Sequence, residues 1–112
     1  MNYKTYLEEN TNWAIQSVHT QAQSVIYKWR RPGVPGTLEM ELLPEAAVVL
    51  TLGNERITIP SPDVVSKVYG REATDMDMLK LFNQVLMRLE ESCKGDRRDI
   101  EQAFGRYSRK QK

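Results

Sequence analysis

Apolar side chains near the start of the chain recur at helical spacing. Six of them fall close to one stripe of a helix over residues 2–22 and just beyond: Tyr3, Leu7, Ala14, Val18, Ala22 and Val25. The polar residues 10–12 interrupt this stripe, and Thr11 or Asn12 is suited to cap the start of a helix. The segment is therefore either one helix with a polar middle or a frayed turn followed by a helix from residue 12. The spacing favours one amphipathic helix.

Residues 24–43 change to a period of two, which is typical of strands, around a central turn rich in Pro and Gly. The apolar positions that alternate on one face are Val25, Tyr27, Trp29, Leu38, Met40 and Leu42. We expect an antiparallel hairpin that pairs Trp29 with Leu38. The same register sets Lys28 opposite Glu39, whereas a slip by one residue would set Trp29 opposite Glu39 and scramble the faces.

Two further apolar runs, residues 46–52 and 55–59, are separated by Gly53 and Asn54. A Gly-Asn pair between such runs predicts a two-residue hairpin, because the first central residue of the turn needs a positive φ. This turn sets two apolar pairs, Leu50 with Ile57 and Val48 with Ile59. The sheet therefore has four expected strands, arranged as two hairpins.

Helical signals return after the sheet. Ser61 is a good N-cap with a proline after it, and Gly70 is a natural stop for a short helix. The expected apolar side of this helix is Val64, Val65 and Val68. Thr74 then caps the strongest helix in the chain, over residues 75–93, with acids in its first turn.

The apolar stripe of that helix is Leu79, Phe82, Leu86, Leu89 and Cys93, widened by Met78 and Val85. Gly95 is expected to end it, and Asp96 to cap a last helix over residues 97–107. The fold class is therefore α+β: an N-terminal helix, a four-stranded antiparallel sheet and two to three C-terminal helices packed on one face. Residues 1–108 are expected to form a single domain and residues 109–112 a basic tail.

Charge, cysteine content and the length of the apolar runs limit the kinds of protein that this sequence can encode. The chain has 112 residues and a formal net charge of +1, but residues 92–112 carry seven Lys and Arg against three Asp and Glu. A solvated end accounts for this basic segment more simply than a binding role does. A single cysteine excludes an internal disulfide and predicts a reducing compartment, the cytoplasm. No apolar run is long enough to predict a membrane-spanning helix.

Candidate chemistry is sparse. His19 is the only histidine, and Cys93 lies on an apolar stripe, so neither has an indicated catalytic or zinc-binding partner. Asp75 and Asp77 are explained by the start of their helix. No glycine-rich phosphate loop is present. The sequence therefore predicts a protein that is not an enzyme and holds no metal or cofactor.

These observations lead to two hypotheses about the function of the protein. We expect a small binding factor for another protein, of inhibitor, immunity-type, chaperone-like or accessory kind, with a homodimer as a further option. The alternative is a nucleic-acid-binding accessory protein that uses the basic C-terminal segment, although the chain as a whole is nearly neutral. Tyr27 and Trp29 among basic residues could stack on bases, but their alternation favours the core. The expected partner-binding residues are Arg30, Arg31, Arg97, Arg98, Arg106, Met76, Met78 and Met87.

Overall fold

The computed structural model describes the backbone of residues 2–110 and the side chains of residues 2–92. Its helices are α1 (Tyr3–Asn10), the short 3-10 helix η1 (Pro44–Ala46), α2 (Pro62–Tyr69) and α3 (Asp75–Lys110). Its strands are β1 (Ala14–Thr20), β2 (Val25–Arg30), β3 (Leu38–Leu42), β4 (Val48–Leu52) and β5 (Glu55–Ile59). The prediction of an α+β fold is confirmed.

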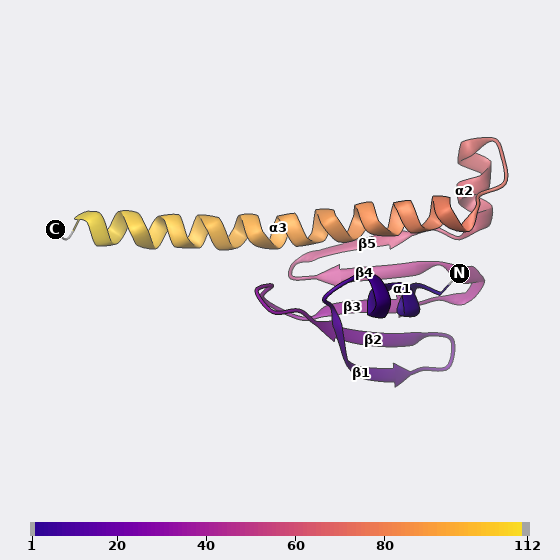
Figure 1. Ribbon diagram of the computed structural model, residues 1–112, viewed down its shortest axis with the longest axis horizontal. Coiled ribbons are helices and arrows are strands. Elements are labelled where there is room, and N and C mark those ends of the chain that lie inside the picture. Colours follow the sequence, from indigo (N-terminus) through magenta and orange to yellow (C-terminus); the bar gives the residue numbers. More distant parts are fainter. Residues whose placement is uncertain (1, 111–112) are drawn as a thin grey trace.

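The five strands form one antiparallel sheet in which each strand pairs with its neighbours in the sequence. α1 lies over the middle of the sheet, and α3 runs along β5 and continues well past the end of the strands (Figure 1). α2 forms a corner between β5 and α3. Among the described residues, no helix combines the length and the apolar character that crossing a bilayer requires.

All three α-helices contribute to one core with the sheet. The fully buried side chains of that core include Leu7 from α1, Trp29 and Leu38 from the sheet, and Phe82 from α3. Tyr3 stacks on Phe82 with ring centroids 4.6 Å apart. Burial raises the pKa of the Tyr3 hydroxyl above its ordinary value, because the phenolate would lose its hydration.

The expected register of both hairpins is confirmed. Trp29 pairs with Leu38, and Lys28 pairs with Glu39 across the strands, with the charged groups of that pair 3.7 Å apart. The second hairpin has the expected apolar pairs, Leu50 with Ile57 and Val48 with Ile59. Trp29 is fully buried, which confirms the prediction that this tryptophan belongs to the core.

The expectation of one helix over residues 2–22 is wrong. α1 ends at Asn10, where the Thr11 hydroxyl donates to the Leu7 carbonyl at 2.6 Å and accepts the Trp13 amide at 3.2 Å. The chain then turns into β1, which raises the strand count from four to five. Positions four residues apart suit one face of a helix and one face of a strand alike, so the spacing after residue 13 could not separate the two.

The predicted break at Gly95 and the separate last helix are also wrong, because α3 continues to Lys110. A glycine inside a helix costs only about 1 kcal/mol relative to alanine, and this segment contains no proline. Arg109 and Lys110 were expected in a tail, but both lie within α3. Residues 111 and 112 lie outside the described part of the chain.

The predicted ends of α2 and the start of α3 are confirmed. The Ser61 hydroxyl accepts the Val64 amide, and Gly70 ends α2 with a φ of 71°, in the left-handed region that favours glycine. Thr74 and Asp77 satisfy each other reciprocally: the Asp77 amide donates to the Thr74 hydroxyl at 3.2 Å, and the Thr74 amide donates to the Asp77 carboxylate at 2.9 Å. These bonds fix the corner between α2 and α3.

Candidate functional site

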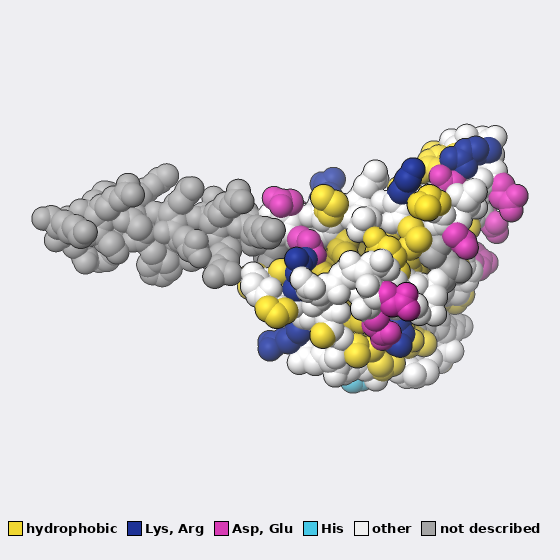
Figure 2. Space-filling model, in the orientation of Figure 1, with side chains coloured by type: hydrophobic (Ala, Val, Ile, Leu, Met, Phe, Trp, Pro, Cys, Tyr) yellow, Lys and Arg dark blue, Asp and Glu magenta, His cyan; other side chains and the backbone are white. Residues whose placement is uncertain are grey.

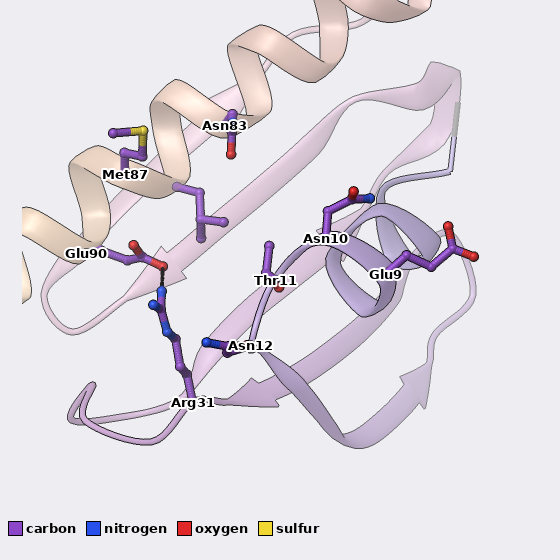
Figure 3. A pocket seen from close by; sticks show the side chains of 9 residues that line it. Glu9, Asn10, Thr11, Asn12, Arg31, Asn83, Met87 and Glu90 are labelled. Atoms are coloured by element: carbon purple, nitrogen blue, oxygen red, sulfur yellow. Dashed lines mark hydrogen bonds and ion pairs between the residues drawn. The ribbon is translucent and has the colours of Figure 1, made fainter.

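A cleft opens between α3, the segment that joins α1 to β1, and the end of β2 (Figure 3). It has a volume of about 430 Å³. Its lining is mainly polar and consists of Glu9, Asn10, Thr11, Asn12, Arg31, Asn83, Leu86, Met87 and Glu90. Three segments that are far apart in the sequence therefore build this hollow together.

Glu90 is the central polar residue of the cleft. Its Oε1 accepts the Trp13 indole N–H at 2.8 Å and the Arg31 guanidinium, also at 2.8 Å. The Glu90 side chain is only 14% exposed, and Trp13 is buried. A carboxylate in such a place requires hydrogen-bonding and charged partners, and these two residues supply them. The contact ties the α1–β1 connection and the end of β2 to α3.

The remaining polar groups of the cleft suit hydrogen bonding to a bound group. Asn12 and Asn83 are exposed at its rim and carry amides that both donate and accept. The Thr11 hydroxyl and the Asn10 amide are already bonded to the end of α1. Within residues 2–92, no three His, Cys, Asp or Glu side chains come together as metal ligands. The cleft can recognise a polar group by direct contact.

The structure brings part of the expected partner-binding set together. Arg31 lies in the cleft and is held by Glu90, while Arg30 is exposed at the end of β2 beside it. Met87 lines the same cleft and is 59% exposed. Arg97, Arg98 and Arg106 lie in the part of α3 whose side chains are outside the described residues. The nucleic-acid alternative depends on those three arginines and stays a prediction.

The other two methionines of the expected partner-binding set, Met76 and Met78, differ in their exposure to solvent. Met76 is 61% exposed in the first turn of α3. Met78 is only 1% exposed and belongs to the core, so its assignment to a partner-binding surface is corrected. Residues two apart on a helix point in different directions, which is why Met76 faces out and Met78 faces in.

Sequence reasoning missed the outer side of α2. Three valines were expected to form its apolar side, yet only Val65 is buried. Val64 is exposed, and Val68 is 78% exposed, which is the largest exposure among the described large hydrophobic residues. Tyr69 is exposed beside them, with the Arg71 guanidinium 5.2 Å from its ring centre. A short helix can pack against the rest of the protein through a single buried residue. The spacing of its apolar residues therefore does not show which of them stay exposed.

A charged contact braces the same corner. The Arg71 guanidinium donates to both carboxylate oxygens of Asp77, at 2.6 and 3.0 Å. The Arg71 guanidinium, together with the Thr74 amide, holds the pKa of the Asp77 carboxyl well below its usual range. The Ser66 hydroxyl adds a bond from the Ala73 amide at 2.8 Å. The loop between α2 and α3 is thus fixed by side-chain contacts at both ends.

This ion pair makes a pH-dependent prediction. Because the pKa of Asp77 is lowered by folding, its stabilising effect is present above the unfolded-state pKa, about 4, and is lost as the pH falls through the lower pKa of the folded state. We expect Asp77→Asn to lower the thermal midpoint at pH 7. The difference in thermal midpoint between Asp77→Asn and the unchanged protein should shrink as the pH falls below the unfolded-state pKa of about 4. Melting curves from pH 2 to pH 7 measure this. Gln84→Ala, an exposed substitution on α3 that changes no titratable group, should show no such pH-dependent difference from the unchanged protein. An Asp77→Asn difference that is the same at every pH would contradict the assignment.

The fold and these surfaces define a small α+β protein in which helices cover one face of a five-stranded antiparallel meander. No protein-family model, curated protein or solved structure matches the chain.

Proposed function

We propose that this chain is a small non-enzymatic factor that acts by binding another protein, and that the outer side of α2 with the start of α3 is its contact surface. The observation that carries the proposal is the exposure of Val68, at 78%, together with Met76 and Val64. Exposed apolar side chains that gather in one region mark sites of protein interaction more often than isolated ones do. The partner is a protein that presents apolar side chains of its own.

The arrangement of the residues supports this surface. Val64 and Val68 are one turn apart and share a side of α2. Asp63 and Lys67 on the same helix are exposed and would form a polar rim. Figure 2 shows hydrophobic and charged side chains side by side at the α2 end of the molecule. Complete burial of one aliphatic side chain is worth about 1.5–3 kcal/mol, so each of these residues would contribute to such a contact.

The corner is also ordered before any partner arrives. The Arg71 contact with Asp77 and the bond from the Ala73 amide to Ser66 hold the loop between the helices. The Ser66 hydroxyl in turn donates to the Pro62 carbonyl at 2.8 Å, inside α2. A surface that is already rigid loses less conformational entropy on binding.

Comparative affinity capture from a lysate of the source cells tests the proposal. The unchanged chain, Val68→Lys and Gln84→Lys are immobilised side by side. A lysine near the end of a helix suits the helix dipole, so Val68→Lys should keep the fold while placing a charge in the contact. We expect proteins retained by the unchanged chain and by Gln84→Lys, an exposed site on α3, to be at least about tenfold depleted on Val68→Lys, which corresponds to 1.4 kcal/mol.

Equal retention by all three chains would show that α2 is not the contact. Retention of no protein by the unchanged chain would contradict the proposed function. Far-ultraviolet circular dichroism of both variants checks that any loss comes from the surface and not from unfolding.

A further inference from the structure

β1 is an open edge of the sheet. It pairs with β2 on one side and stands at the end of the strand order. In Figure 1 no other described element runs along its outer side. The opposite edge strand, β5, differs because α3 lies along it. An edge strand presents backbone N–H and C=O groups that can pair with another strand.

The sequence of β1 does little to prevent such pairing. Proteins commonly protect an edge with lysine, proline or other charged side chains. Residues 10–27, which include all of β1 and the turn after it, contain no Lys, Arg, Asp, Glu or Pro. β5, in contrast, carries Glu55 and Arg56. A bulge at Gln16 interrupts the register of β1, but residues 17–20 continue regularly beside β2.

β1 also carries apolar side chains that its own molecule leaves uncovered. Val18 pairs with Tyr27 and Ile15 with Trp29, so both point to the face of the sheet that holds the core. Val18 is nevertheless 48% exposed, and Ile15 is exposed as well. The apolar face of the sheet therefore continues to its rim beyond the cover of α1.

We infer that β1 pairs with β1 of a second copy of this chain, in antiparallel orientation about a two-fold axis. In such a contact each residue faces a residue of the same strand, so a charged strand would repel itself or need internal charge pairs. An uncharged strand faces no such cost. The sheet is antiparallel throughout, and a two-fold axis perpendicular to it extends the same pairing across the contact.

The faces of the sheet require a register centred on a residue, and the half-exposed Val18 selects which residue that is. Residues directly opposite each other in an antiparallel pair lie on the same face. A register centred on Val18 satisfies this: Val18 faces Val18 of the second copy, and Ser17 faces His19 of the second copy. The helices of both copies then lie on the same face of one continuous sheet. The two half-exposed valines cover each other. A contact of one short strand is small, so the dimer is weak and reversible.

Sedimentation velocity of the full chain over a concentration series tests this contact. We expect the unchanged chain to convert from monomer to dimer as its concentration rises. Val18→Lys sets two like charges against each other at the axis and should remain monomeric over the same range. Gln23→Lys, in the exposed turn after β1, adds the same charge outside the paired region and should still dimerise. Circular dichroism confirms that each variant is folded.

A cross-link tests the register itself. In a Cys93→Ser background, Val18→Cys should form a disulfide-linked dimer under mild oxidation, because opposite residues across an antiparallel pair have Cβ atoms about 4.5–5.5 Å apart. Gln23→Cys should not. A monomer at every concentration, an intact dimer of Val18→Lys, or equal cross-linking by Gln23→Cys would overturn the inference. Val68→Lys should dimerise normally, so this result is separable from partner binding by α2.

Discussion

Replacing Phe82 with alanine should lower the free energy of unfolding by about 3–5 kcal/mol, the usual cost of removing a buried phenyl ring. Phe82 is fully buried where α3 meets α1. Tyr3 stacks on its ring, and Tyr6 meets it edge-on with centroids 5.9 Å apart. The alanine would leave a cavity and remove both aromatic contacts. Domains of this size have only about 5–15 kcal/mol of stability in total, so the variant should be close to unfolding.

Urea denaturation followed by tryptophan fluorescence measures this change, since Trp13 and Trp29 are both buried. Gln84→Ala is the matched control, because it removes an exposed side chain from the same helix and should change stability by no more than about 0.5 kcal/mol. A loss for Phe82→Ala as small as that of the control would mean that α1 does not pack on α3 as the structure shows.

Glu90→Ala should lower the free energy of unfolding by about 1–3 kcal/mol, because it leaves the buried indole N–H of Trp13 without its acceptor. The loss of the ion pair with Arg31 should add little. The Arg31 side chain is partly exposed to water, and such pairs contribute about 0–1 kcal/mol. Glu91→Ala, the next residue and exposed, should stay within about 0.5 kcal/mol of the unchanged protein.

A double-mutant cycle identifies the source of that loss. Trp13→Phe removes the N–H while keeping an aromatic ring. If the unpaired N–H is responsible, Glu90→Ala should cost less in the Trp13→Phe background than in the unchanged chain. Strictly additive effects of the two substitutions would show that the 2.8 Å bond between Trp13 and Glu90 does not stabilise the fold.

Features that depend on neighbours in the sequence were predictable. The alternation on both sides of the first turn set the register of β2 and β3, because only one register keeps every large apolar side chain on the same face. The Gly53-Asn54 turn, the Ser61 cap and the Thr74 cap were found for the same reason. Each is a short-range arrangement in which a particular residue type satisfies a particular backbone geometry.

The first helix was misjudged because its evidence was ambiguous at short range. Tyr3 and Leu7 do form the buried side of α1. Ala14 and Val18 continued the same spacing, but their segment gains more by pairing with β2. That pairing belongs to a sheet that continues through β3, β4 and β5, and the packing of the whole sheet can override local helical spacing. The strand count and the open edge at β1 both follow from that competition.

The cleft could not be predicted at all. Its central bonds join Glu90 to Trp13 and to Arg31, which are 77 and 59 residues away in the sequence. Sequence reasoning singled out Arg31 and Met87 as exposed residues, but it had no means of placing them beside Glu90. A contact between distant segments has no local pattern, because it depends on how complete elements pack against one another.

By itself, the sequence determined the α+β class, the hairpin registers and the caps at Ser61, Gly70 and Thr74, since these follow from side-chain period and from local hydrogen bonds. Only the tertiary structure decided that residues 14–20 form a strand, that Met78 faces the core while Val68 faces out, and that Glu90 joins three segments. Periodicity shows that an element has an apolar side. Which neighbour covers that side, and how completely, is set by the packing of the whole chain.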